Sequence, residues 1–132
     1  MFRVYHFEIP AGDTEKTAEF YRKVFGWDIK KWENEAGVDY QLVMTGEMDA
    51  PGGINGGIMK RRGPKAKDND TETAFVCTIQ VPSAEEYSKK VEDAGGKITA
   101  PKMGVPGVGW LVYAKDIDGN TFGMLQEDKE AV

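Results

Sequence analysis

The residues best able to do chemistry lie near the N-terminus, where His6 and Glu8 stand two positions apart in an alternating apolar stretch. Because successive strand side chains point to opposite sides, both polar groups are expected on one face, with Tyr5, Phe7 and Ile9 on the other. Imidazole titrates near neutral pH, so the pair could provide acid–base chemistry or hydrogen bonds to a bound small molecule. His6 could equally be a structural histidine bonded to Glu8, and the sequence leaves both roles open.

The elements expected to position this pair are a helix and three further strands. Asp13 predicts a helix N-cap, an apolar stripe with three- and four-residue spacing continues to Phe25, and Gly26 predicts the helix end. Runs rich in apolar residues then predict strands over residues 27–32, 38–45 and 54–60. The sequence therefore predicts a βαβββ unit.

The same order returns in the second half of the chain, where Ser83 corresponds to Asp13 and Gly96 to Gly26. In this alignment His6 and Glu8 correspond to Val76 and Thr78. A strand is expected from residue 73, and a capping box at 83–86 predicts the next helix. The remaining expectations are strands at 97–99, 110–115 and 121–126, a Gly/Pro-rich loop at 100–109, a turn at 116–120 and a frayed tail at 128–132.

The repeat predicts an α+β fold of two tandem βαβββ modules, with the helices on the outer face of a cup-shaped sheet. We expect one domain over residues 1–132, made of module 1–60, linker 61–72 and module 73–127. A concave surface away from the helices is where a small ligand is expected. Alternatively, side chains fill the cup and the fold serves only assembly.

Composition excludes several other classes of protein. The net charge is −5, and the one basic run, at residues 60–67, reads as a solvated connector, so no nucleic acid is expected. No apolar run is long enough to cross a membrane, and no signal peptide is evident, so no membrane partner is expected. Cys77 is the single cysteine, which excludes an internal disulfide and favours a cytoplasmic location.

Three stretches carry a family resemblance, namely HFEIPAGDTEKTAEFYRKVFGW, GGINGGIMKR and DIDGNTFGMLQ. They resemble the glyoxalase/bleomycin-resistance/extradiol-dioxygenase superfamily, also called vicinal oxygen chelate proteins, over nearly the whole chain. The resemblance implies paired βαβββ modules that form a cup, and commonly a homodimer. Members include isomerases, dioxygenases, epoxide-opening transferases and drug-sequestering proteins.

Metal-dependent members of that superfamily imply a ligand on the first and last strand of each module. By this resemblance His6 occupies one ligand position, whereas Val76, Gly123 and one of Gly56 or Gly57 occupy the others. A catalytic divalent ion needs about three protein ligands, so no tight metal site is expected and any other cofactor is unknown. Glyoxalase I activity is not expected either, because Gly123 cannot supply a ligating carboxylate.

Other residues complete the candidate site. Glu8 with Gln41 or Gln126 could add donors to His6 in an untypical metal site. Thr78, Trp110 and Tyr113 are candidate ligand contacts, with Trp110 expected to reach the cup from the Gly/Pro-rich loop. A flat ligand could stack on the strand aromatics Trp27, Trp32, Tyr40, Trp110 and Tyr113. Strand aromatics are more often core or dimer-interface residues, which we expect for Trp27. The paired glycines 56 and 57 could leave room for a ligand or accommodate a bulge.

These observations predict a metal-free small-molecule binding protein of the glyoxalase/bleomycin-resistance type, with an unknown ligand and a homodimeric assembly. The alternative is an isomerase or lyase, lactoylglutathione lyase-like or related, acting on a small carbonyl compound. In that alternative His6 and Glu8 are the catalytic residues.

Overall fold

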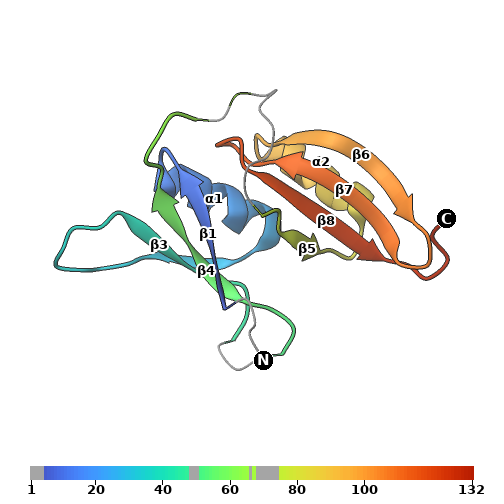
Figure 1. Ribbon diagram of the computed structural model, residues 1–132, viewed down its shortest axis with the longest axis horizontal. Helices are drawn as coiled ribbons and strands as arrows, with labels where there is room; N and C mark the ends of the chain where they lie inside the picture. The colour runs from blue at the N-terminus through green and yellow to red at the C-terminus, as the bar shows by residue number, and fades with distance from the viewer. Residues whose placement is uncertain (1–4, 48–50, 66, 68–74) are drawn as a thin grey trace. The chain divides into compact units, whose positions relative to one another are not determined.

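The computed structural model describes residues 5–47, 51–65, 67 and 75–132 (Figure 1). The chain forms two compact units, Met1–Lys65 and Ala66–Val132, and each has its own sheet and its own helix. Within the described ranges, no helix is both long and apolar enough to span a membrane.

The first module contains one helix and a four-stranded mixed sheet. Its sheet has the order β1-β4-β3-β2, in which β1 pairs with β4 in parallel and the other pairs are antiparallel. The elements in chain order are β1 (His6–Ala11), α1 (Thr14–Phe25), β2 (Asp28–Lys31), β3 (Tyr40–Met44) and β4 (Asn55–Lys60).

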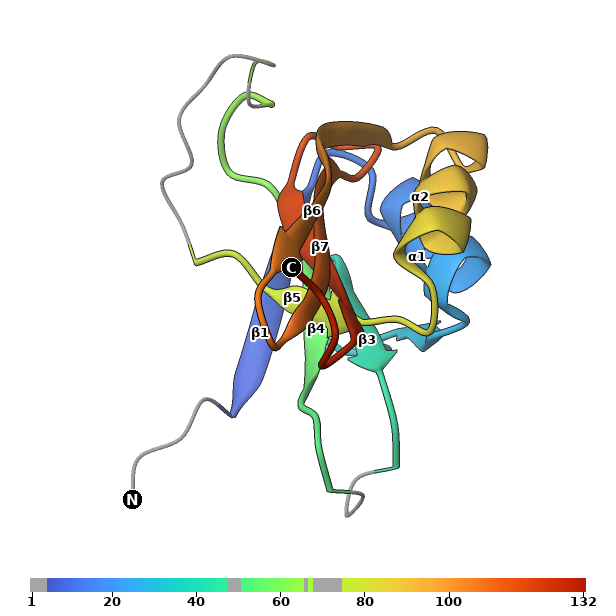
Figure 2. The same ribbon diagram turned by 90° about the vertical axis from the view of Figure 1, so that its right-hand side faces the viewer.

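Helix α1 begins and ends where the sequence predicts. The Asp13 side chain accepts a hydrogen bond from the Lys16 N–H over 3.0 Å, and Gly26 adopts a left-handed φ of 69° at the helix end. The apolar face of α1 is buried with one face of the sheet, where Val43 and Ile58 are at most 1% exposed. Within the described part of this module, the other face of the sheet carries no helix (Figure 2), and we call it the helix-free face.

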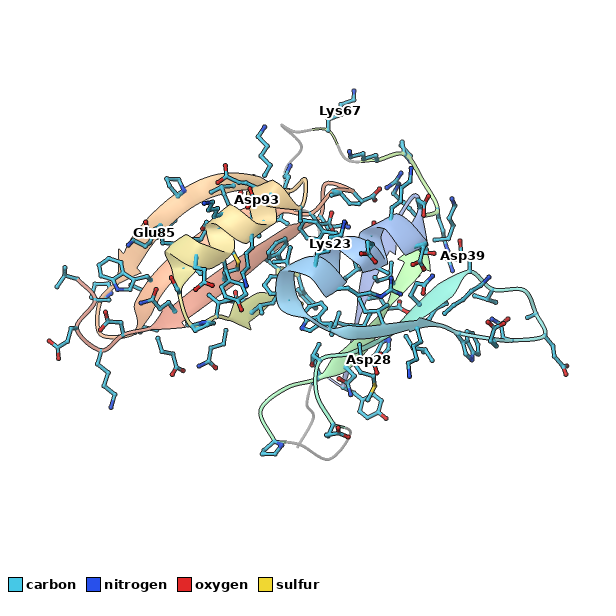
Figure 3. The ribbon with its side chains drawn as sticks, turned by 180° about the vertical axis from the view of Figure 1, so that it is seen from behind. Lys23, Asp28, Asp39, Lys67, Glu85 and Asp93 are labelled. Carbon is cyan, nitrogen blue, oxygen red and sulfur yellow. The ribbon has the colours of Figure 1, made fainter. Side chains whose placement is uncertain are left out.

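The second module repeats this arrangement with the sheet order β5-β8-β7-β6. Its helix is capped by the Ser83 hydroxyl, which accepts from the Glu86 N–H over 3.1 Å. Figure 3 shows this helix from behind, with Glu85 in its first turn and Asp93 at its end. The elements are β5 (Thr78–Gln80), α2 (Ala84–Asp93), β6 (Lys97–Val105), β7 (Gly109–Lys115) and β8 (Thr121–Glu127).

The α+β fold of two βαβββ modules is confirmed. The single domain and the cup concern how the two modules sit together, and both stay predictions. The expected strand from residue 73 begins outside the described residues, and the structure starts β5 at Thr78. Part of the expected linker also lies outside them.

Two sequence predictions in the second module are wrong. Most of the expected Gly/Pro-rich loop is strand, because β6 extends to Val105 and contains Pro101. It is an edge strand with two register shifts, which is where a sheet tolerates proline. The expected frayed tail is fixed instead, because Ala131 is 4% exposed and its carbonyl accepts from the Gly107 N–H.

Candidate functional site

The helix-free face of the first sheet brings His6 and Glu8 to the same side, as strand alternation predicts. Across the sheet, Glu8 lies opposite Gly57, which pairs with Leu42 on β3. One row further along, Tyr40 of β3 pairs with Met59 on β4. The face therefore carries two polar side chains at one edge and apolar side chains toward its middle.

Tyr40 joins the two polar side chains. Its hydroxyl donates to Glu8 Oε2 over 2.9 Å and lies 2.8 Å from His6 Nε2. The direct separation of His6 Nε2 and Glu8 Oε2 is 4.0 Å, too long for a hydrogen bond. The structure thus replaces the expected His6–Glu8 contact by a bridged group, which we call the His6–Tyr40–Glu8 cluster.

Gly57 makes this bridge sterically possible. A Cβ atom at Gly57 would lie 2.1 Å from the ring and hydroxyl atoms of Tyr40, so the ring lies over a position that only glycine leaves empty. On the opposite face, a Cβ at Gly56 would lie 2.3 Å from the Phe7 carbonyl oxygen. The ladders continue through both glycines without a register shift, so this pair makes room for other residues of the chain and not for a bulge.

The electrostatics of the cluster keep the Tyr40 phenol protonated. Burial of the half-buried ring, followed by its hydrogen bond to Glu8 and the charge of Glu8, raises the pKa of Tyr40 to about 12. At neutral pH this hydroxyl is therefore a neutral donor to a carboxylate and acts neither as a base nor as a nucleophile. The acid–base capacity of the cluster lies in His6 and Glu8, whose side chains are 41% and 47% exposed.

The residues at the implied ligand positions do not fit a metal ion. The Tyr40 ring fills the space where a carboxylate at position 57 would project, and a Cβ at Gly123 would lie 2.8 Å from Thr78 Oγ1. Among the described residues, no group of three or more histidine, cysteine or acidic side chains could hold an ion. Val76, at the remaining position, supplies no ligand atom.

Neither glutamine oxygen is placed to supplement His6 and Glu8: Gln41 Oε1 is buried without a hydrogen-bond partner on the opposite face of the sheet, and Gln126 Oε1 already has a partner. Gln41 is 2% exposed on the face that packs on α1, and its Nε2 lies 3.4 Å from Thr14 Oγ1. The Oε1 atom of Gln126 accepts from the Ala84 N–H at the start of α2. The expectation that these side chains could complete a donor set was therefore wrong.

In the second module, two of the predicted ligand contacts come together. Thr78 and Tyr113 both pair with Gly123, from β5 and β7 respectively. A Cβ at Gly123 would lie 2.8 Å from Thr78 Oγ1 and 3.4 Å from the Tyr113 ring. This is the second module's counterpart of the arrangement around Gly57, with a threonine in place of Glu8.

Trp110 lies elsewhere in that module. It pairs with Gln126 and shares its strand face with Val112, which is fully buried, whereas Tyr113 faces the other way. Its Nε1 donates to Asp128 Oδ2 over 2.9 Å, and Lys102 Nζ lies 5.2 Å from its ring centroid. The structure does not bring Trp110 together with Thr78 and Tyr113.

Sequence reasoning missed the central role of Tyr40, which it considered only as an aromatic that could stack on a ligand. The signal was present in the spacing of the strands, because placing β3 beside β4 puts a large ring next to Gly57. The neighbouring Trp32 lies edge-on to Tyr40 at 6.1 Å between centroids and is 43% exposed. Trp27 instead is half-buried and stacks on Tyr21 of α1 with 5.2 Å between ring centroids, and its expected role in the core or the dimer interface stays a prediction.

Comparison with known proteins agrees with this architecture. Residues 3–124 match the Glyoxalase/Bleomycin resistance protein/Dioxygenase superfamily, and the chain belongs to that superfamily. No curated protein sequence matches it significantly. The comparison with solved structures supplies the same fold at low sequence identity.

Three of those structures illustrate the range. A mutant of the fosfomycin resistance protein FosX from Listeria monocytogenes, complexed with Mn(II) and 1S,2S-dihydroxypropylphosphonic acid, is 16% identical with a TM-score of 0.72; the match covers 97% of this chain and 94% of that one. TioX from Micromonospora sp. ML1 is 15% identical with a TM-score of 0.66, over 96% and 100%. A glyoxalase I mutant from Zea mays is 21% identical with a TM-score of 0.73, over 95% of this chain and 45% of the maize chain.

Proposed function

We propose that this protein binds a small molecule without the metal ion that metal-dependent members of its superfamily use. The observation that carries the proposal is the Tyr40 ring over Gly57, in the space of an implied metal-binding carboxylate. The hydroxyl of the same residue joins His6 to Glu8 by hydrogen bonds, so a tyrosine side chain stands at the centre of the site. His6 and Glu8 would contact the ligand in the first module, and Thr78 and Tyr113 in the second.

The rest of the proposal concerns assembly and location. We infer a homodimer in the cytoplasm whose partner is a small-molecule ligand, with neither nucleic acid nor membrane as a partner. Superfamily membership and the acidic composition support this inference. Sedimentation of the purified protein tests the dimer directly, and a monomer at micromolar concentration would contradict it.

The absence of a metal is tested by elemental analysis of purified native protein beside His6→Ala. We expect no stoichiometric divalent metal in either sample. Added Mn²⁺ should also leave the NMR signals of His6 unbroadened, and these signals are easily followed because the chain has a single histidine. About one metal per subunit in the native protein, lost in His6→Ala, would overturn the proposal.

One observation favours the enzymatic alternative, an isomerase or lyase acting on a small carbonyl compound. A proton taken up by His6 could pass through the Tyr40 hydroxyl to Glu8, because the two hydrogen bonds are 2.8 and 2.9 Å long. Compounds that bind in a screen should therefore be re-examined for turnover. If a compound is turned over at the same rate by His6→Ala, this alternative is wrong.

A further inference from the structure

The direction of the hydrogen bonds in the His6–Tyr40–Glu8 cluster determines which ligands it can bind. Tyr40 has one hydroxyl proton and donates it to Glu8. Its oxygen can then only accept from His6, which places a proton on the His6 Nε2 atom. In neutral His6 the other ring nitrogen, Nδ1, therefore carries a lone pair.

Two acceptor atoms remain without a partner after these internal bonds. Among the residues that the structure describes, nothing bonds to His6 Nδ1 or to Glu8 Oε1. Both side chains are more than two-fifths exposed, so a ligand can approach them. With His6 neutral, the cluster offers no spare donor, and a ligand that contributes only acceptors gains nothing from it.

The charges on the helix-free face also favour a cationic ligand. Lys30, which pairs with Leu42 across β2 and β3, has its own acidic partner, Asp28, at 3.9 Å. Among the described residues of this face, Lys30 and Asp28 balance each other and Glu8 has no cationic side chain opposite it in the sheet. The exposed apolar side chains of Trp32 and Leu42, each 43% exposed, supply a surface for the hydrocarbon part of a ligand.

We propose that Tyr40 holds His6 and Glu8 so that the cluster presents acceptors and no spare donor, and that Glu8 binds a small primary amine as its ammonium ion. The ammonium group can form a charge-assisted hydrogen bond with Glu8, and the cluster has no donor that would favour an anion instead. Tyr40 is a positioning residue in this arrangement, because it acts on the ligand through its two neighbours. The inference rests on the proposed function and specifies its ligand class.

The first test concerns the proton on His6, seen in nitrogen–proton NMR spectra. We expect the Nε2-protonated form in native protein, with exchange of that proton slowed by its bond to Tyr40. In Tyr40→Phe the slowed exchange should be lost, whereas Tyr87→Phe, which removes a hydroxyl from α2, should leave it unchanged. A native protein with the proton on Nδ1, or an unchanged exchange rate in Tyr40→Phe, would overturn the inference.

The second test uses three probes of matched size and different charge: n-butylamine, n-butanol and n-butyrate. At neutral pH we expect n-butylamine to shift the His6 signals saturably, at least about tenfold more tightly than n-butanol, as one charge-assisted bond predicts. n-Butyrate should produce no saturable shift. In Glu8→Gln, which keeps the shape of the side chain, the advantage of the amine should disappear.

Three outcomes of the probe experiment would overturn the ligand class: no saturable shift with n-butylamine, a stronger effect of n-butyrate, or equal amine binding in Glu8→Gln. None of these outcomes would contradict the proposed metal-free binding function, which is contradicted only if a His6-dependent metal is found. Conversely, such a metal would remove the proposed function whatever the probes do. The two failures are therefore distinguishable.

Discussion

The two modules place a glycine at the same point of their last strand, yet use it differently. Gly57 lies beside Glu8 of β1, and Gly123 lies beside Thr78 of β5. Over Gly57 the Tyr40 ring reaches across from the next row and ends in two hydrogen bonds. Over Gly123 the Thr78 hydroxyl comes closest. One fold thus carries a polar cluster in one module and a simple close contact in the other.

Under the proposed function, this difference assigns the acid–base groups to the first module. The His6–Tyr40–Glu8 cluster combines an imidazole and a carboxylate with a half-buried hydroxyl donor, whereas Thr78 and Tyr113 offer only hydroxyl groups. Equal losses of stability on replacing the two glycines, or Tyr40 and Tyr113, would contradict this contrast between the modules. Unequal losses would measure it.

The largest difference is expected between Gly57→Ala and Gly123→Ala. The new methyl group in the first variant would lie 2.1 Å from the Tyr40 ring, which must leave the cluster, and the free energy of unfolding should fall by about 2–3 kcal/mol. In Gly123→Ala the nearest atom is a side-chain oxygen at 2.8 Å, and the loss should be about 1 kcal/mol. Urea denaturation of both variants provides the measurement.

A double variant shows whether the ring is the cause. Adding Tyr40→Ala to Gly57→Ala should cost less than the sum of the two single changes, because the clash is already removed. Strict additivity would mean that Gly57 is needed for a reason other than the ring. Equal losses in Gly57→Ala and Gly123→Ala would remove the contrast between the modules.

A smaller difference is expected between Tyr40→Phe and Tyr113→Phe. Loss of the Tyr40 hydroxyl leaves a half-buried site without its bridging hydrogen bonds, so unfolding should become easier by about 1 kcal/mol. No hydrogen bond holds the Tyr113 hydroxyl among the described residues, and its loss should stay within about 0.5 kcal/mol. Thermal unfolding of the two variants under identical conditions distinguishes them, and equal effects would contradict the proposed role of Tyr40.

The fold could be predicted from the sequence because its signals are local and occur twice. Asp13 and Ser83 cap their helices as expected, and strand alternation correctly placed His6 with Glu8. The errors came where distant segments decide. The Gly/Pro-rich segment is a strand because it pairs with β7. The expected frayed tail is held in place because the Ala131 carbonyl accepts a hydrogen bond from the Gly107 N–H.

The candidate site could be predicted only in part, for the same reason. Tyr40 reaches His6 and Glu8 across β4, and this contact depends on strand order and on the missing side chain of Gly57. Contacts of this kind depend on which strands are neighbours, and the composition of a single segment does not contain that information. The error on Trp110 has another cause: it lies three residues before Tyr113 on β7, so strand alternation alone turns the two side chains to opposite faces.

The last prediction concerns the alkaline titration of Tyr40, which has the smallest effect on stability at neutral pH. Burial, then the bond to Glu8, raise the pKa of Tyr40 to about 12, so its ionisation should appear as a late step, absent from Tyr40→Phe, when alkaline titration is followed by ultraviolet absorbance. Between the usual tyrosine pKa of about 10 and this value, the folded protein keeps a proton that the unfolded chain has lost. The stability from this proton is complete below that window and is lost as the pH rises through it.

Two variants separate the causes of this shift. Tyr40→Phe should remove the late step and flatten the loss of stability with rising pH. Glu8→Gln should lower the Tyr40 pKa only part of the way, because burial contributes more than Glu8 does. A Tyr40 that titrates near the usual tyrosine value in native protein would mean that its hydroxyl is hydrated, and would contradict the hydrogen-bonded cluster of the first module.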